Sequence, residues 1–285
     1  MPELPEVETI KNDLRKKILN KKIVSFSVEK NSARNGVKDF SQKLVGSKLT
    51  DIDRIGKLLI FKIGKKDDFL LIHLKMTGQL IYVFKKEVVA GGHSLGKALE
   101  LPNKYTRAIF GFAGTSKLFF NDLRRFGYLE LVDKNRLEKV KSRFGIEPLK
   151  SDFKFVDFKN IFKDKKAPVK AILMDQSKIA GIGNIYADEI LFEAGIMPKR
   201  AAGSLSEDEL KRVFKACGSV LKKAIKYRGT TFSDYLDADG KMGNFTSFLK
   251  VYGRKEGEKC LDCPGIIRKM KIGGRSTKYC EGCQK

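Results

Sequence analysis

The chain has 285 residues and carries 58 Lys and Arg against 34 Asp and Glu, a net charge of +24. This length predicts roughly two domains. The charge favours a polyanionic partner, with nucleic acid ahead of an acidic membrane surface, although a lysine-rich solvated surface would give the same balance. No apolar run approaches the roughly 20 residues that cross a bilayer, and no signal peptide is recognisable. We therefore expect a cytoplasmic protein whose five cysteines are thiols or metal ligands, not disulfides.

The chain opens with "MPELPEVETI", which predicts a helix that begins within the first residues. Glu3 and Glu6 suit the positive end of the helix dipole. One apolar face follows at helical spacing, formed by Val7, Ile10, Leu14 and Ile18. This explains the glutamates but not Pro2, which becomes an N-terminal secondary amine once Met1 is removed.

Seven short apolar or aromatic runs follow, most of them separated by Gly, Asn or Asp turns. They predict an antiparallel sandwich or barrel reaching to about residue 132. The runs are 22–28, 57–63, 69–74, 79–84, 107–112, 117–120 and 127–132. The charged stretch 133–152 indicates a junction.

Beyond the junction the periodicity becomes helical, most clearly over residues 206–229. Ser206 and Glu209 have capping-box spacing, and Gly229 is suited to end the helix. Cys217 lies on the apolar face, which predicts a buried structural thiol.

The strongest local pattern is Cys260-x2-Cys263, sixteen residues, then Cys280-x2-Cys283. Two such pairs predict a closed four-cysteine site for one structural zinc ion. The segment between them has a Gly273-Gly274 hairpin signal and several basic residues. Zinc would therefore hold a small basic ribbon that suits a phosphate backbone, or that only closes the fold.

Two further segments have patterns that suit nucleic acid. The glycine-rich "KIAGIGNIYADEIL" leads into a helix with Asn184 as a candidate N-cap, and such a helix start suits phosphate. With the helical pattern before it, this predicts a helix–two-turn–helix. Arg124, Arg125 and Phe126 place two cations beside an aromatic ring at a turn, as in proteins that wedge DNA apart. Taken alone, Phe126 and Met76 would be ordinary core residues.

Together these segments resemble the formamidopyrimidine-DNA glycosylases, which repair oxidised purines. The motifs "PELPEVET", "HLKMTG", "DLRRFG", "GIGNIYADE", "VYGR" and "GRSTKYCEGCQK" match in the family's order and span almost the whole chain. The resemblance implies an α+β fold: a β-sandwich with the N-terminal helix, then a helical lobe with the helix–two-turn–helix and a four-cysteine zinc-finger hairpin. We expect domains at 1–135, 136–247 and 248–285.

The resemblance also implies the chemistry. The deprotonated amine of Pro2 attacks C1′ of a flipped nucleotide, and the resulting iminium allows strand cleavage by elimination. Glu3 is implied as the general acid/base, with Glu6 in support. Lys57 is implied near the phosphate and leaving group, and Arg275 in the second elimination.

For DNA binding, the resemblance implies phosphate contacts and a group that fills the vacated stack. Phosphate contacts are expected from Lys165, Lys170 and Asn184. The stack would be filled by Met76, Arg124 and Phe126, with Arg124 on the orphaned cytosine. Tyr105 stands where many relatives carry a DNA-contacting histidine, and residues 230–245 resemble the family's base-capping loop. We expect a bacterial, nucleoid-associated monomer acting on duplex DNA with oxidised purines or abasic sites.

Two other functions stay open from the sequence. One is an endonuclease VIII-like enzyme for oxidised pyrimidines, which Leu4 and the "DLRRFG" motif disfavour. The other is a non-catalytic zinc-finger DNA-binding protein, which would have no need of Pro2 and Glu3.

Overall fold

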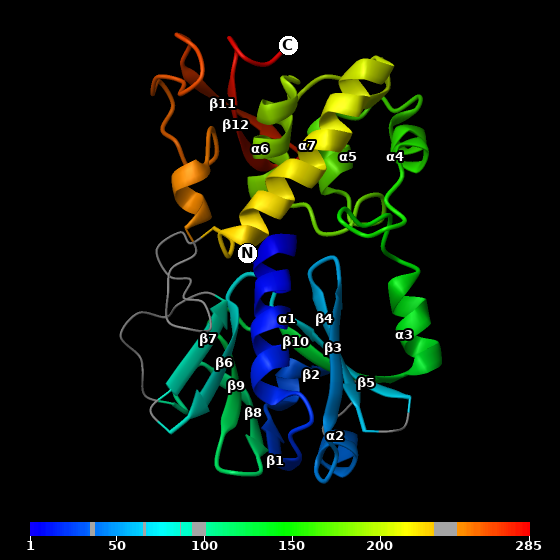
Figure 1. Ribbon diagram of the computed structural model, residues 1–285, viewed down its shortest axis with the longest axis vertical. Helices are drawn as coiled ribbons and strands as arrows, with labels where there is room; N and C mark the ends of the chain where they lie inside the picture. The colour runs from blue at the N-terminus through cyan, green and yellow to red at the C-terminus, as the bar shows by residue number, and fades with distance from the viewer. Residues whose placement is uncertain (35–37, 65–66, 86, 93–100, 231–243) are drawn as a thin grey trace. The chain divides into compact units, whose positions relative to one another are not determined.

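The computed structural model describes residues 1–34, 38–64, 67–85, 87–92, 101–230 and 244–285. Contacts divide the chain into two compact units (Figure 1). Unit 1 comprises residues 1–142 and 227–246, and unit 2 comprises residues 143–226 and 247–285. Among the described residues, no helix combines the length and apolar content that a bilayer crossing needs.

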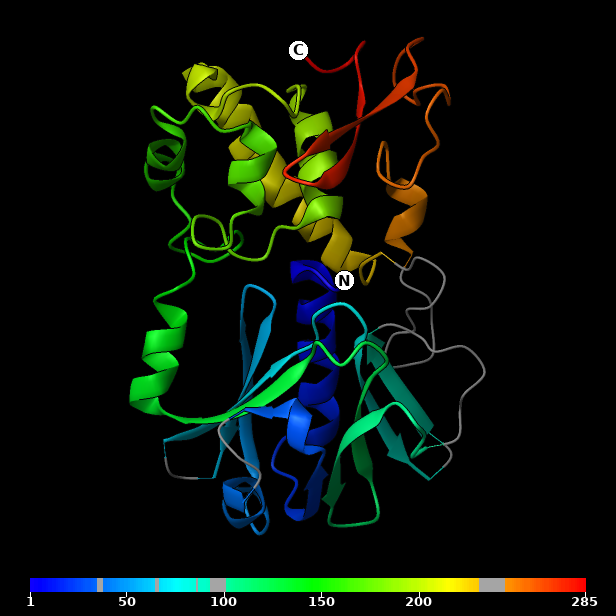
Figure 2. The ribbon, with the colours of Figure 1, turned by 180° about the vertical axis from the view of Figure 1, so that it is seen from behind.

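Unit 1 begins with helix α1 (Leu4–Ile18), as the opening periodicity predicts. A proline occupies its first turn, Glu6 lies near its N-terminus, and basic residues occupy its last turn. The predicted apolar face is buried, and α1 contacts strands of both sheets of the unit (Figures 1 and 2).

Two five-stranded sheets follow α1 in unit 1. The first has the order β1-β8-β9-β6-β7 and the second β2-β10-β5-β4-β3. Among the strands that the structure describes in unit 1, β2 alone pairs in parallel, with β10. The strands of the first sheet are β1 (Ile23–Val28), β6 (Gly78–Phe84), β7 (Glu87–Gly92), β8 (Thr106–Phe112) and β9 (Lys117–Asp122). Those of the second are β2 (Ala33–Arg34), β3 (Leu49–Ile55), β4 (Leu58–Ile63), β5 (Asp68–His73) and β10 (Tyr128–Asp133).

All seven predicted runs are strands, and an apolar core joins the two sheets and α1. Strands β2, β3 and β7 were not predicted. In β3, Asp51, Asp53 and Arg54 interrupt the apolar residues. Arg54 nevertheless is only 6% exposed, and its Nε donates to Glu8 of α1 at 2.8 Å. Helices α2 (Lys38–Leu44) and α3 (Lys134–Lys141) complete the unit.

Unit 2 is built on four helices. They are α4 (Phe155–Phe162), α5 (Val169–Met174), α6 (Asn184–Ala194) and α7 (Glu207–Lys226), with short 3-10 turns at Ala202–Ser204 (η2) and Phe245–Phe248 (η3, which starts in unit 1). The predicted capping box of α7 is confirmed: the Ser206 N–H donates to Glu209 Oε2 at 2.8 Å, and the Glu209 N–H donates to Ser206 Oγ at 3.3 Å. Cys217 is fully buried on this helix, and burial raises the pKa of its thiol, which supports the structural role.

The end of unit 2 is a two-stranded hairpin of β11 (Ile267–Ile272) and β12 (Arg275–Cys280). Ile272 pairs with Arg275, so the turn consists of Gly273 and Gly274 alone. Both glycines have positive φ, 55° and 75°, as a tight two-residue turn requires. The predicted hairpin is confirmed, and Arg275 lies beside its turn.

Candidate active site, DNA-contacting loops and zinc finger

The N-terminal segment is held in place before α1 begins. Pro2 is buried and Glu3 is 3% exposed, with Glu3 at the N-cap of α1. The Glu6 carboxylate accepts a hydrogen bond from the Glu3 N–H at 2.8 Å. This bond fixes the peptide that joins Pro2 to Glu3. The ring of Pro2 fixes its φ angle. Once the peptide is held, ψ of Pro2 is therefore the one backbone torsion that can still move the ring nitrogen relative to it.

The second oxygen of Glu6 binds residues from the far end of the sequence. Glu6 Oε1 accepts from the Thr230 N–H at 2.8 Å and from its hydroxyl at 3.2 Å. Gly229 lies so close that an added Cβ would be 2.6 Å from Glu6 Oε1. An ion pair of Arg228 with Asp13, 2.6 Å, adds a second anchor on α1. Residues 231–243, most of the expected base-capping loop, lie outside the described part of the chain.

Lys57 is 6% exposed at the start of β4, and it lies near His73, which the sequence analysis did not select. Burial is the largest of the causes that lower the pKa of His73 to about 3, and the charges of Lys75, Lys57 and Arg34 contribute to the same shift. Its ring is therefore neutral at pH 7. Nδ1 accepts from the Lys75 N–H at 3.0 Å, so the ring proton is on Nε2 and is a donor. The signal that was available is a histidine at the end of a buried strand, directly before the "KMTG" turn.

The residues expected to fill a vacated stack come from two neighbouring loops of unit 1. Met76 is half-buried in the turn between β5 and β6, while Arg124 is exposed and Phe126 is 53% exposed between β9 and β10. The guanidinium of Arg124 lies 4.7 Å from the Phe126 ring centroid. Tyr105 is half-buried, and its carbonyl accepts from the Asp122 N–H at 2.8 Å, beside these loops.

In unit 2, Asn184 and Arg275 are brought close together, while Lys165 is exposed in the turn after α4. Asn184 Nδ2 donates to the Ser276 carbonyl, the residue after Arg275, at 3.0 Å. The prediction that Asn184 caps α6 is wrong: Gly183 is the N-cap and Asn184 is the first helical residue. The asparagine side chain binds the finger hairpin instead of its own helix.

Lys170 is fully buried, contrary to the exposure that a phosphate contact needs. Its Nζ lies 2.7 Å from Asp188 Oδ1, and both side chains are 0% exposed. It also donates to Thr277 Oγ1 at 2.8 Å and to the Ser276 carbonyl at 3.3 Å. This burial argues against the predicted direct DNA contact. Lys170 instead joins α5, α6 and β12, the strand that begins at Arg275.

Asp188 and Glu189 are adjacent on α6 and bind different segments. Asp188 Oδ2 accepts from the Lys278 N–H of β12 at 3.1 Å. Glu189 accepts from three successive N–H groups, those of residues 250–252, at 2.7–2.9 Å. Burial raises the pKa of both carboxyls, to about 7 for Asp188, and the hydrogen bonds and charges around them oppose this rise.

The four predicted ligands form one site at the end of unit 2. Their sulfur atoms all lie within 4.8 Å of one another; the ligands are Cys260, Cys263, Cys280 and Cys283. The Sγ atoms of the first and fourth are 3.8 Å apart, and those of the second and third are 3.5 Å apart. A tetrahedral site with Zn–S bonds of about 2.3 Å places its sulfurs about 3.8 Å apart.

The surroundings of this site also fit thiolates. The Asp262 and Gly265 N–H groups donate to the sulfurs of Cys260 and Cys263 at 3.4 Å and 3.3 Å. A Cβ at Gly282 would lie 2.8 Å from a ligand sulfur, so the backbone must pass close to the metal position. The residues therefore suit one structural zinc ion with no open coordination position.

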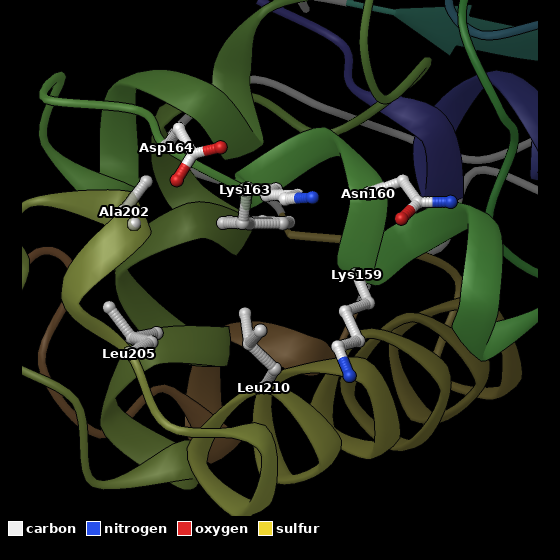
Figure 3. A pocket seen from close by; sticks show the side chains of 9 residues that line it. Lys159, Asn160, Lys163, Asp164, Ala202, Leu205 and Leu210 are labelled. Carbon is white, nitrogen blue, oxygen red and sulfur yellow. The ribbon is translucent and has the colours of Figure 1, made fainter.

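A separate cavity of about 160 Å³ lies in unit 2 between α4 and the start of α7 (Figure 3). Its wall is formed in part by Ala202, Leu205 and Leu210, with Lys159 and Lys163 at its polar side. Lys159 is already paired with Glu207. None of the predicted site residues lines this cavity.

Comparison with known proteins gives the same family along nearly the whole chain. Residues 1–129 match the formamidopyrimidine-DNA glycosylase N-terminal domain, 144–235 the H2TH domain of these enzymes, and 257–285 the zinc finger found in FPG and IleRS. The formamidopyrimidine-DNA glycosylase of Carboxydothermus hydrogenoformans is 42% identical over 287 residues, covering 100% of both chains. That of Listeria monocytogenes serovar 1/2a is 37% identical, also over 100% of both chains.

Solved structures agree with this match. The Lactococcus lactis Fpg in complex with abasic-site DNA has a TM-score of 0.87 at 33% identity, covering 99% of each chain. A variant of the same protein with Fapy-dG-containing DNA has a TM-score of 0.86 at 33% identity, covering 100% of each chain. The predicted fold class and the predicted resemblance are confirmed.

Proposed function

Because this chain belongs to the formamidopyrimidine-DNA glycosylase family of bifunctional glycosylases and AP lyases, we propose that Pro2 is the nucleophile of both reactions. The observation that carries the proposal is the buried Pro2–Glu3 segment, whose connecting peptide is held by Glu6. A surface proline at a frayed terminus would have no such restraint.

The reaction uses the free ring nitrogen that removal of Met1 exposes. The unprotonated amine attacks C1′, the bond to the damaged base breaks, and the sugar ring opens to an iminium on Pro2. The iminium is an electron sink, so a proton leaves C2′ and the 3′ phosphate is expelled. A terminal amine with an ordinary pKa near 8 is partly unprotonated at neutral pH, so no large shift is required.

We assign the other catalytic roles from the family resemblance, and the positions of the side chains support them. Glu3 supplies and accepts the proton of the sugar oxygen as the ring opens. Lys57 offers a positively charged hydrogen-bond donor, and the Nε2–H of His73 offers a neutral one. The two residues lie near each other in unit 1, and together they suit a phosphate oxygen. Arg275 is exposed beside the finger turn and serves the second elimination.

For DNA binding, we propose that Met76, Arg124 and Phe126 fill the vacated stack, with Arg124 on the orphaned base. Phe126 is exposed with the Arg124 guanidinium 4.7 Å from its ring, and DNA-bending proteins combine an apolar wedge with arginine in this way. Lys165, Asn184 and Tyr105 remain proposed backbone contacts. The net charge of +24 supplies the salt-sensitive, sequence-independent part of the affinity.

The substrates are proposed from the relatives. The Lactococcus lactis protein binds DNA with an abasic site or Fapy-dG, and we extend both to this chain, together with 8-oxoguanine paired with cytosine. The place of action that this implies is the bacterial chromosome in the cytoplasm.

Borohydride trapping tests the proposal. Mature protein incubated with an 8-oxoguanine:cytosine duplex and borohydride should form a covalent protein–DNA species. Chain that retains Met1, and the Pro2→Gly variant, should form far less of it, although the variant's terminal glycine keeps a primary amine. Absence of trapping with mature wild-type protein, checked by intact mass, would reject Pro2 as the nucleophile.

A further inference from the structure

A buried carboxylate, that of Asp122, lies between the two loops that carry Met76, Arg124 and Phe126. It is the last residue of β9 and is 0% exposed. Its side chain was not selected in the sequence analysis, because an aspartate at the end of a strand is an ordinary turn signal. The hydrogen bonds around it indicate a more specific role.

Both carboxylate oxygens of Asp122 accept hydrogen bonds from loop residues. Oδ1 accepts from the Thr77 hydroxyl and from the Arg124 N–H, the latter at 3.2 Å. Oδ2 accepts from the Gly127 N–H at 2.7 Å. Thr77 Oγ1 in turn accepts from the Arg124 N–H at 3.0 Å. One carboxylate therefore joins the residue after Met76 to both ends of the Arg124–Phe126 segment.

The backbone of the two loops is tightly constrained around this carboxylate. Gly78 pairs with Asp122 across β6 and β9, and its N–H donates to the Leu74 carbonyl at 2.8 Å. A Cβ at Gly78 would lie 2.4 Å from that carbonyl oxygen. A Cβ at Gly127 would lie 2.7 Å from the Phe120 ring and 3.0 Å from Asp122 Oδ2. Arg125 has a positive φ of 58°, which an L-residue adopts only at some energetic cost.

We propose that Asp122 is a positioning residue that holds both loops in the shape in which Met76, Arg124 and Phe126 enter the DNA stack. The inference rests on the stack-filling role proposed above. An exposed aromatic ring and a long arginine side chain lose conformational entropy when they insert, and a pre-shaped loop reduces that loss at the moment of binding. A fully buried carboxylate with three donors suits this task, because leaving any of them unpaired is unfavourable.

The decisive variant is Asp122→Asn, which keeps the shape of the side chain. An amide offers one acceptor oxygen where the carboxylate offers two. Either the Gly127 N–H or the Thr77 and Arg124 donors then face an NH2 group. Loss of a hydrogen bond to a charged group corresponds to about a 10- to 100-fold effect when it acts on a single step.

Single-turnover excision from an 8-oxoguanine:cytosine duplex is the first measurement. D122N should lower it about tenfold or more, as should F126A, since both impair insertion. Borohydride trapping on a single-stranded abasic oligonucleotide is the second, because no stack has to be filled there. We expect D122N to stay within about twofold of wild type in this assay.

The double variant D122N/F126A separates positioning from general damage. If Asp122 acts through the loop, the double variant should excise no more than about twofold more slowly than the worse single variant, because effects on one element are not additive. Thr77→Val should reproduce part of the D122N effect, and Thr77→Ser, which keeps the hydroxyl, should restore wild-type excision. This pair keeps the test valid if D122N folds poorly.

Glu130→Gln is the matched control, since Glu130 is a buried carboxylate of the neighbouring β10 that pairs with Arg136 at 3.0 Å. It should leave excision unchanged at a similar loss of thermal stability. Full additivity of D122N and F126A, or normal excision by D122N while F126A is impaired, would overturn the role of Asp122. Normal excision by M76A and F126A would instead reject the stack-filling proposal itself, and with it the present inference.

Discussion

The buried pair of Lys170 and Asp188 predicts a large and pH-dependent effect of Lys170→Met. The variant leaves a fully buried carboxylate with the Lys278 N–H but without its cation. Breaking a buried ion pair by removing one partner costs about 3–5 kcal/mol of folding free energy. Lys170→Met also removes the donor to Thr277 Oγ1, so we expect a value in the upper half of that range.

The pH dependence gives this prediction its sign. Burial raises the pKa of Asp188 to about 7 in the folded wild type, from 3.8. The folded state thus binds this proton more tightly than the unfolded state. The contribution of this group to stability falls as pH rises from about 4 to about 7, and is then constant. Without Lys170 the folded pKa rises further, so the variant keeps losing about 1.4 kcal/mol per pH unit above pH 7 while the wild type does not.

The free energy of unfolding is measured by equilibrium urea unfolding of the zinc-loaded chain between pH 6 and 9. The free zinc concentration is held fixed, because the metal binds the folded state and so stabilises it. Lys163→Met, which removes an exposed lysine of the same unit, should change stability by less than about 0.5 kcal/mol. The double variant K170M/D188N should be less destabilised than the sum of the single variants. A K170M effect below about 1 kcal/mol that does not change with pH would refute the reasoning.

Four further outcomes follow from the contacts. Gly127→Ala should destabilise the fold by about 1–3 kcal/mol and so lower the thermal midpoint, because there is no space for the added Cβ. An unchanged midpoint would contradict the close packing. Glu209→Gln should reduce the loss of folding stability that the wild type shows as pH falls. The Arg200 guanidinium lowers the pKa of Glu209 to about 2, so its contribution is present above about pH 4.5 and is lost as pH falls towards 2. Zinc removal by a chelator should abolish duplex binding together with the β-hairpin signal in circular dichroism, and readdition of zinc should restore both. Retained duplex binding would show that the finger folds without metal. Glu6→Gln should slow single-turnover excision about tenfold, since one of its acceptor oxygens becomes a donor, and a normal rate would remove its supporting role.

The strands of unit 1 could be predicted because their apolar residues are nearly continuous, as in residues 57–63 and 69–74. Strand β3 could not, since polar residues interrupt its pattern and the partner of its buried Arg54, Glu8, lies on α1. The zinc ligands followed from spacing alone. The role of Pro2 followed from the family resemblance, since a helix start explains the neighbouring glutamates but gives Pro2 no function.

Three polar residues of the site have partners that the sequence did not reveal. The family resemblance implied a phosphate contact for Lys170, but its side chain is buried and paired with Asp188 inside unit 2. Asparagines before a helix usually cap it, but Asn184 binds the finger hairpin. Asp122 was passed over because its partners come from two separate loops. Such partners become apparent only when the tertiary contacts are known.

The two adjacent carboxylates of α6 have a consequence for protein engineering. Glu189 holds the backbone of residues 250–252 at the entry to the finger, and Asp188 holds β12 at its far side. The metal alone therefore does not define the orientation of the basic hairpin. A graft of residues 257–285 onto another scaffold would carry the zinc but lose both anchors, so this finger is not a portable DNA-binding cassette.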